Sequence, residues 1–197
     1  MTPTTTAAPG SLELVRAFVN TRDVDQATDR LADVEGLGSW LVENGFLDER
    51  EEPGLGEADR ARAVALREAF RDLLLGNNDG RPIERETAAA LDGAAARARV
   101  GLHLGADGLV RLEAQAPGAD GALGRLLLIA YEAMEHGEWR RLKACRNDTC
   151  QWGFYDHSKN RSKTWCRMEV CGSQVKSRAY RARRRAEADG RSDAPVR

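Results

Sequence analysis

The sequence contains no long hydrophobic run, and this limits where the protein can reside. A membrane-spanning helix needs about 18 consecutive apolar residues, whereas the longest apolar run here, Leu126 to Tyr131, ends at Glu132. Residues 1–10 also lack the basic start and the apolar core of a secretory signal. We therefore expect a cytoplasmic protein with no membrane segment, in which residues 1–11 form a disordered leader.

Motifs of catalysis and repetition are missing as well. The chain has no internal repeat, no heptad pattern and no glycine-rich phosphate loop, and His103 lies in a segment of strand character. Asp156, His157 and Ser158 follow one another in the chain, but neighbouring residues rarely converge as a catalytic triad. A turn in which the Asp and the Ser bond nearby backbone amides suits this segment better. We expect a protein that is not an enzyme.

The net charge of -1 hides an uneven distribution of charge. Residues 1–138 carry 14 Lys and Arg against 25 Asp and Glu, whereas residues 139–197 carry 16 against 6. The second part stays strongly basic even if a metal site with four thiolates adds negative charge to it. A basic end on an acidic body suggests a polyanionic partner, although charge runs are also often only solvated surface.

Helices are the main feature predicted for the N-terminal part of the chain. Apolar residues recur there at helical spacing in four segments, with glycines as stop signals. Pro82 is expected in the first turn of one of them, where its missing N–H does no harm. The predicted helices cover residues 33–44, 57–75, 82–97 and 122–136.

Strands are predicted in two places. Residues 12–20 mix helical and strand periods and are rich in branched and aromatic side chains, so they suit a buried strand or the start of a helix, and we favour the strand. Residues 100–104 and 110–114 alternate apolar with polar or small side chains around Asp107-Gly108, which predicts a β-hairpin. The expected fold class is α+β: a mainly helical N-terminal domain with a small antiparallel sheet, followed by a small four-cysteine zinc finger and a C-terminal basic helix.

All four cysteines fall in one short stretch and form two pairs, each with four residues between its members. Zinc is bound by sets of four thiolates, and short loops let two cysteines of one turn reach the same ion. The alternatives are buried free thiols or two disulfides, which a reducing cytoplasm disfavours. A closed four-cysteine shell leaves no position for a catalytic water. The pattern predicts one structural Zn²⁺ bound by Cys145, Cys150, Cys166 and Cys171.

Other residues of this stretch have competing interpretations. His157 lies midway between the cysteine pairs, but four thiolates already complete a zinc shell, so a place at the surface or behind the ligands suits it better. Trp152, Phe154, Tyr155 and Trp165 have rings that can stack on bases. A module this small also needs large apolar groups for a core, and we expect most of the four to be buried.

The residues after Cys171 predict a basic helix over residues 174–186. Val175, Ala179, Ala182 and Ala186 recur at helical spacing and form a narrow apolar stripe suited to lie on the finger. Arginine can bond phosphates or guanine edges through two parallel hydrogen bonds. The cations predicted to contact nucleic acid, on this helix and between the cysteine pairs, are Lys159, Arg161, Lys163, Lys176, Arg178, Arg181, Arg183, Arg184 and Arg185.

DNA is the partner we favour for this basic region, with an affinity that falls steeply with salt because each neutralised phosphate releases counterions. The alternatives are an RNA-binding or protein-interaction module that uses zinc as a scaffold, or arginines that stay hydrated or dock on the acidic body. The N-terminal domain would then sense a small molecule or a stress signal, and nothing in the sequence identifies that ligand.

These residues resemble the CGNR zinc-finger proteins, whose N-terminal part is the ABATE domain and which are associated with stress-induced transcription regulation. The resemblance is carried by Phe18-Val19-Asn20-Thr21, Cys145-x4-Cys150, Phe154-x-Asp156-x-Ser158, Asn160, Trp165-Cys166-x-Met168, Cys171-Gly172, Lys176 and the Arg-rich segment that follows. It implies a zinc-binding and DNA-binding regulator of transcription. The domains expected are a leader (1–11), an ABATE-like α+β domain (12–138), a CGNR-type finger with its basic helix (139–186) and a disordered tail (187–197).

The tetrapeptide that names the family departs in this chain, because Cys171-Gly172-Ser173-Gln174 stands where the family has Cys-Gly-Asn-Arg. The metal ligand and the glycine are kept, so the resemblance still implies zinc binding. An amide and a cation are missing at the start of the basic helix, and any contact that they make in the family is weakened or replaced here.

Overall fold

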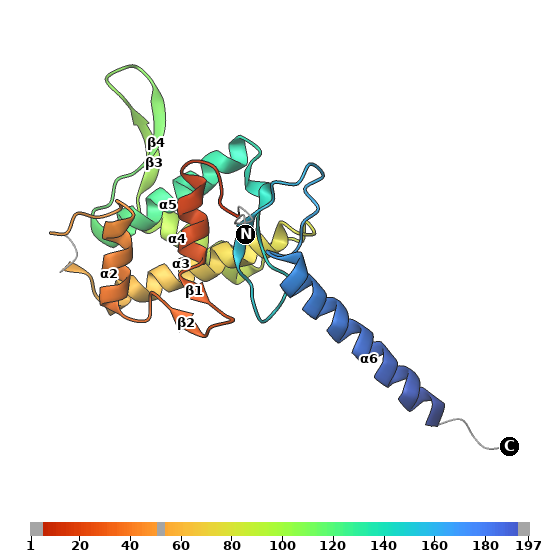
Figure 1. Ribbon diagram of the computed structural model, residues 1–197. Helices are drawn as coiled ribbons and strands as arrows, with labels where there is room; N and C mark the ends of the chain where they lie inside the picture. The colour runs from red at the N-terminus through yellow and green to blue at the C-terminus, as the bar shows by residue number, and fades with distance from the viewer. Residues whose placement is uncertain (1–5, 51–53, 193–197) are drawn as a thin grey trace.

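The computed structural model describes residues 6–50 and 54–192, with side chains as far as Arg184. Helices dominate this part of the chain, and the strands form short antiparallel pairs (Figure 1), which confirms the predicted α+β class. The elements are α1 (Leu12–Val19), β1 (Arg22–Asp23), β2 (Thr28–Asp29), α2 (Val34–Glu43), α3 (Glu57–Gly76), α4 (Arg85–Arg97), β3 (Val100–Leu104), β4 (Val110–Ala114), α5 (Gly118–Glu135), a 3-10 turn (Trp139–Arg141), β5 (Leu142–Ala144), β6 (Gly153–Tyr155), a π-helical turn (Met168–Gly172) and α6 (Ser173–Ser192). Among the described residues, none of the helices combines the length and the apolar character needed to cross a membrane.

The two ends of the chain were expected to be disordered. Residues 1–5 and 193–197 lie outside the described residues. Thr6 contacts the finger, because its carbonyl oxygen accepts a hydrogen bond from Tyr155 N over 2.9 Å. Ala8 N donates to Glu13 Oε2 over 2.7 Å. At the other end, α6 continues past the predicted end at Ala186 to Ser192.

The segment predicted as a strand, residues 12–20, is instead the helix α1. Its buried residues are Leu12, Val15, Phe18 and Val19, and helical spacing places these positions on one face. The branched and aromatic side chains lower the helix propensity by roughly 0.7 kcal/mol per residue at most. Burial of a large apolar side chain contributes about 1.5–3 kcal/mol, so tertiary packing overrides the local preference.

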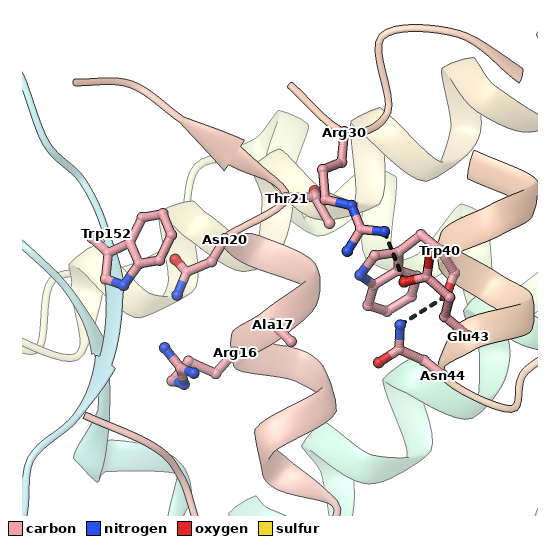
Figure 2. Close-up of a pocket in the computed structure, with 9 residues that line it drawn as sticks. All are labelled: Arg16, Ala17, Asn20, Thr21, Arg30, Trp40, Glu43, Asn44 and Trp152. Atoms are coloured by element: carbon pink, nitrogen blue, oxygen red, sulfur yellow. Dashed lines mark hydrogen bonds and ion pairs between the residues drawn. The ribbon is translucent and has the colours of Figure 1, made fainter. Parts of the chain in front are cut away.

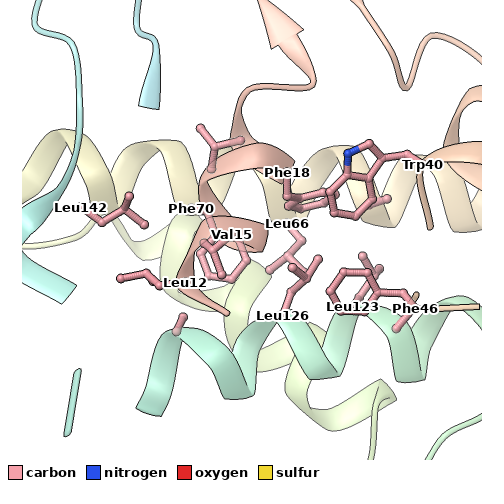
Figure 3. Packing of buried hydrophobic residues seen from close by; sticks show 14 of the residues in the cluster. Leu12, Val15, Phe18, Trp40, Phe46, Leu66, Phe70, Leu123, Leu126 and Leu142 are labelled. Carbon is pink, nitrogen blue, oxygen red and sulfur yellow. The ribbon is translucent and has the colours of Figure 1, made fainter. Parts of the chain in front are cut away.

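The hydrophobic core forms where α1, α3 and α5 pack against one another (Figure 3). Phe18 of α1 lies at its centre, with ring centroids 5.1 Å from Trp40 and 6.4 Å from Phe70. Trp40 of α2 stacks in turn on Phe46 at 5.7 Å. The predicted helices over residues 33–44, 57–75 and 122–136 are confirmed as α2, α3 and α5.

The helix α4 begins at Arg85, so Pro82 does not occupy its first turn as predicted. Glu84 has an extended backbone at the N-cap, and Ile83, which precedes it, is exposed. The start of α4 is tied to α3, because the hydroxyl of Thr87 donates to Asp72 Oδ2 over 2.7 Å and the guanidinium of Arg81 bonds the same carboxylate. These long-range contacts determine where the helix starts.

The hairpin β3–β4 is confirmed and projects from the helical body (Figure 1). Its register pairs Val100 with Ala114 and Leu104 with Val110. Gly108 has a φ of +79°, a conformation that glycine adopts readily. Asp107 Oδ1 accepts the amide of Leu109 over 3.0 Å, so the Asp-Gly pair forms the turn.

The strand pair β5–β6 joins the finger to the body. Leu142, Ala144 and Tyr155 belong to the main hydrophobic core. At the end of α3, Asn77 Nδ2 donates to Leu142 O over 2.8 Å and Asn78 Nδ2 to Ala144 O over 3.0 Å. The strand that leads into Cys145 is therefore held against α3.

Candidate metal centre and nucleic-acid interface

The four cysteine side chains converge on one point. All four Sγ atoms lie within 4.8 Å of one another, with 3.6 Å between Cys150 and Cys166 and 3.7 Å between Cys166 and Cys171. Together with Phe154 they form a second small core, flanked by the half-buried Trp152 and Trp165. The two predicted pairs thus meet, and the aromatic residues between them pack around the thiols.

The first cysteine loop is closed by backbone hydrogen bonds. Cys145 follows β5, and its amide donates to Trp152 O over 3.0 Å. The amide of Cys150 donates to Asn147 O over 2.8 Å. These bonds fold the four intervening residues into a compact turn that brings both thiols to the same side.

The second loop uses a π-helical turn. The amides of Cys171 and Gly172 both donate to Arg167 O, over 3.0 and 3.3 Å. A Cβ on Gly172 would lie 2.5 Å from Met168 Sδ, so the glycine kept from the family tetrapeptide allows the turn to pack closely. The wide turn suits a pair of ligands with four residues between them.

The sulfur positions fit a tetrahedral zinc site. A Zn–S distance of about 2.3 Å places ligand sulfurs about 3.8 Å apart in a tetrahedron, close to the separations above. A disulfide needs about 2.05 Å, and all four cysteines are free. Zinc bound here completes its shell with protein sulfurs, so its role is to hold the loops together.

The shifted pKa values of Cys145, Cys150 and Cys166 show that these three thiols interact strongly. Hydrogen bonds from Cys150 and Cys166 lower the pKa of Cys145 to about 4. Hydrogen bonding with Cys145 raises the pKa of Cys150 and that of Cys166. One thiolate is thus favoured and further ionisation is opposed, and a divalent cation supplies the positive charge that lets all four ionise.

A buried ion pair organises the segment between the cysteine pairs. Asp156 Oδ2 accepts from Lys143 Nζ and from Lys163 N, each over 2.9 Å. Asp156 Oδ1 accepts from the amide and the hydroxyl of Ser158 over 2.9 and 2.6 Å. His157 is exposed and lies 2.9 Å from Ala7 O through its Nε2. Asp156 and Ser158 form the turn expected from the sequence, while the buried Lys143 was not foreseen.

The start of α6 is tied to the first cysteine loop through the buried Asn147. Its Nδ2 donates to Gln174 Oε1 over 3.1 Å, and its Oδ1 accepts from Thr149 Oγ1 and from the guanidinium of Arg178. Gln174 replaces the family arginine and supplies an acceptor that an arginine lacks. Arg178, predicted to contact nucleic acid, also anchors α6 to the finger.

The helix α6 projects away from the body (Figure 1). Val175 is half-buried, but Ala179 and Ala182 are exposed, and the side chain of Ala186 is outside the described part. The predicted apolar stripe therefore does not lie on the finger. A helix of 20 residues is about 30 Å long, and Figure 1 shows that most of α6 extends beyond the finger.

The cations of α6 point into solvent. Lys176, Arg181, Arg183 and Arg184 are exposed, and within the described chain no carboxylate forms an ion pair with them. Arg185 lies on the same helix, but its side chain is not among those described. In the body, by contrast, carboxylates neutralise several arginines. Arg67 forms an ion pair with Asp29 at 2.6 Å. Arg62 forms ion pairs with Asp59 at 2.6 Å and with Asp120 at 3.0 Å.

The three cations predicted between the cysteine pairs lie in different surroundings. Lys159 and Arg161 are exposed. Lys163 is half-buried, and its Nζ lies 5.4 Å from the ring centroid of Phe154 in a cation–π contact. Lys159 and Arg161 thus extend the cationic surface, whereas Lys163 also packs on the small core.

A pocket of about 330 Å³ lies where the finger meets the body (Figure 2). Trp152 of the finger lines it together with body residues from α1, α2 and their neighbours: Arg16, Ala17, Asn20, Thr21, Arg30, Trp40, Glu43 and Asn44. Arg30 and Glu43 form an ion pair of 2.8 Å within it. A molecule bound here would contact both the body and the residue that follows the first cysteine loop.

Two body residues, Asn20 and Arg71, hold the finger through hydrogen bonds to its backbone, a role that was not predicted. Asn20 exchanges two hydrogen bonds with the backbone of Gly153. Arg71 is buried in α3 and donates to Val19 O over 2.7 Å and to Gln151 O over 3.0 Å. An arginine within an apolar helix pattern was the available signal, because a buried arginine requires partners.

Comparison with known families finds two family models that match the chain. The family model described as "Putative stress-induced transcription regulator" (ABATE) matches residues 12–136, which span α1 to α5, and the CGNR zinc finger model matches residues 141–184. No curated protein matches the chain. The zinc-finger match and the converging thiols confirm the predicted single structural Zn²⁺.

Proposed function

The chain belongs to the ABATE family and carries a CGNR zinc finger, and we propose that it is a DNA-binding regulator of transcription rather than an enzyme. Zinc keeps the finger folded, and α6 with the exposed residues Lys159 and Arg161 contacts the nucleic acid. The body formed by α1 to α5 provides the regulatory part.

The observation that carries this proposal is the contrast between the arginines of the body and those of α6. Arg62 and Arg67 are neutralised by nearby carboxylates, so their charge is used inside the molecule. Lys176, Arg181 and Arg183 are exposed on a projecting helix and, in the part of the chain that is described, form no ion pair. Their field is available to phosphates.

The dimensions of α6 agree with a DNA partner. A helix with side chains is about 10–12 Å across, and the major groove of B-DNA is about 12 Å wide. Lys176 and Arg183 are seven residues apart and lie on one face, while Arg184 and Arg181 lie roughly 80° and 140° around the helix from Lys176. Phosphates on both sides of a groove can therefore be reached from one helix.

The pocket at the junction provides a place for regulation. Asn20 and Trp152 both line it, and each is connected to the strand β6 or to the loop that leads into it. A ligand in this pocket would change contacts on both sides of the junction. We propose that a small polar or anionic molecule binds there, next to Arg16 and Arg30, and acts on the finger.

RNA is the second candidate partner, and the residue that favours it is Tyr180. This side chain is exposed on α6 beside Arg181, and an exposed ring flanked by cations can stack on an unpaired base. A duplex presents no unstacked base, so a clear preference for single strands would favour RNA.

The test is a fluorescence anisotropy titration of the zinc-loaded full chain against a labelled DNA duplex and a labelled single-stranded RNA. If the protein makes six phosphate contacts, raising the salt from about 50 to 200 mM should lower its affinity for the duplex about a thousandfold. Absence of duplex binding even at about 50 mM salt would refute the DNA proposal. Tighter binding to the RNA would favour the second candidate.

A further inference from the structure

The hairpin β3–β4 has one apolar face and one polar face. Because side chains alternate along a strand, cross-strand pairs two residues apart share a face. The apolar face consists of the pairs Val100–Ala114, Leu102–Leu112 and Leu104–Val110. The other face carries His103, Arg111 and Glu113.

Among the described residues, the chain's own contacts cover the base of the apolar face and leave its outer half exposed. At the base, Gly124 of α5 packs so closely that a Cβ there would lie 2.7 Å from the Cβ of Ala114. Farther out on this face, Leu102 is 75% exposed, Leu104 67% and Val110 60%. Figure 1 shows this half of the hairpin beyond the helical body. Single exposed apolar residues are common, but three on one face of a projecting arm form a patch of the kind that marks an interaction site.

An apolar pocket of about 380 Å³ opens at the foot of the same hairpin. Its walls come from α3, α4, α5 and the base of the hairpin, and include Leu73, Leu91, Leu112 and Leu127. Tyr131 and Met134 of α5 also line it and are 45% and 44% exposed. The pocket therefore continues the apolar surface of the arm onto the body.

We propose that two copies of this chain exchange arms: the hairpin of each covers the apolar pocket of the other, in a two-fold symmetric dimer. The arm and the pocket lie on the same chain and are both apolar, so the surface is self-complementary, as a two-fold interface requires. The five large side chains Leu102, Leu104, Val110, Tyr131 and Met134 are 44–75% exposed and offer on the order of 600 Å² per chain, comparable to the ~800 Å² that each partner buries in a stable interface.

The hairpin of one chain cannot cover the apolar pocket of the same chain. Five consecutive pairs hold β3 and β4 in register, and Ala114 is fixed against α5, so the tip is held away from the body. A second copy supplies the matching pocket, and His103 and Glu113 stay in solvent on the outer face. The helix α6 leaves the body on the opposite side from the hairpin in Figure 1, so the dimer leaves it free.

The direct test is the mass of the zinc-loaded full chain by analytical ultracentrifugation over a range of concentrations. We expect twice the chain mass of 21.6 kDa. The arm variant Leu104→Glu/Val110→Lys puts an opposite-charge pair across the strands, which preserves the hairpin. It should raise the dimer Kd about a hundredfold or more, because two apolar side chains per arm lose their cover. The control His103→Glu/Glu113→Lys places the same charges on the polar face and should leave the Kd unchanged.

A mixing experiment separates arm exchange from simple pairing of two arms. The pocket variant Tyr131→Glu/Met134→Lys changes exposed rim residues one turn apart, so the helix tolerates it. Each variant alone should be monomeric, whereas an equimolar mixture should form heterodimers, because one intact arm still meets one intact pocket. Circular dichroism and zinc content verify that each variant is folded. A monomeric wild type, a dimer insensitive to the arm variant, or a mixture without heterodimers would overturn the proposal, as would a monomer that co-purifies with an apolar small molecule in the pocket.

Discussion

Asn20 and Gly153 are joined by two hydrogen bonds that connect the end of α1 to the finger strand β6. The amide of Gly153 donates to Asn20 Oδ1 over 2.7 Å, and Asn20 Nδ2 donates to Gly153 O over 2.9 Å. The side chain of Asn20 thus satisfies the backbone N–H and C=O of Gly153, which a neighbouring strand would otherwise have to pair. Asn20 also lines the pocket at the junction, so this pair connects the pocket to the strand β6.

Replacing this side chain should loosen the finger. Asn20→Ala leaves the amide and carbonyl of Gly153 without their partner, and we expect a loss of about 1–3 kcal/mol in the free energy of unfolding. Urea denaturation followed by tryptophan fluorescence measures it. Asn44→Ala is the matched control, because Asn44 Nδ2 bonds Trp40 O within its own helix end, and it should not increase hydrogen exchange at β6. Equal exchange at β6 in both variants would contradict the role given to Asn20.

Removal of zinc should unfold the cysteine loops. Purified protein should contain one equivalent of zinc, and Cys166→Ser should lose most of it, because three thiolates and a hydroxyl make a weaker site. Chelation should shift the fluorescence of Trp152 and Trp165, which pack on the cysteines, and added zinc should restore it. Zinc content well below one equivalent in the wild type, or full zinc in Cys166→Ser, would count against a structural site.

The buried pair Lys143–Asp156 should make a large contribution that depends on pH. Asp156→Ala leaves a buried ammonium without its counter-charge, which costs about 3–5 kcal/mol. Burial acts to raise the pKa of Asp156, but hydrogen bonds from Ser158 and Lys143 outweigh it and lower the pKa below its ordinary value. The stabilisation is therefore present above the unfolded pKa of about 3.9 and is lost as the pH falls through the folded pKa.

The measurement for this pair is urea unfolding at neutral pH and at steps down to acidic pH. The difference between wild type and Asp156→Asn should be largest at neutral pH and shrink at the acid end. Lys143→Met/Asp156→Ala should lose less stability than the two single changes added together, since neither charge is then left alone. Strict additivity would show that the two groups do not interact.

The exposed cations of α6 should contribute to DNA binding by neutralising phosphates. Lys176→Ala, Arg181→Ala and Arg183→Ala should each weaken binding across sequences and reduce the slope of log affinity against log salt by about 0.9. Arg62→Ala, in the body, should leave the slope unchanged. A slope that does not respond to any of the α6 changes would place the contact elsewhere.

Arg178→Ala should behave differently from its neighbours on α6. Its guanidinium bonds the buried Asn147, so its loss should lower the thermal stability of the finger by an amount equivalent to about 1–3 kcal/mol, in addition to any loss of affinity. Differential scanning fluorimetry separates it from Lys176→Ala, which should melt like the wild type. Identical melting of the two variants would show that Arg178 is not an anchor.

Local patterns were sufficient for most of the secondary structure, and α1 shows where they fail. Helices α2, α3 and α5 and the hairpin follow from spacing and turn residues that act within the segment itself. In α1 the branched and aromatic side chains favour a strand locally, and only packing against α3 and α5 decides for the helix. Pro82 is a similar case, because Arg81 and Thr87 fix the start of α4 through Asp72, which is distant in sequence.

The sequence by itself determined the zinc site, the cationic helix and the acidic body, because cysteine spacing and charge are properties of short stretches. Only the tertiary structure decided which cations are available, since Arg178 is bound to Asn147 and Lys163 packs on Phe154 while Arg181 is exposed. It also decided that Ala179 and Ala182 of α6 are exposed and that, among the described residues, the outer half of the apolar face of the hairpin has no cover. The physical reason is that burial and hydrogen-bond pairing depend on residues brought together from across the chain.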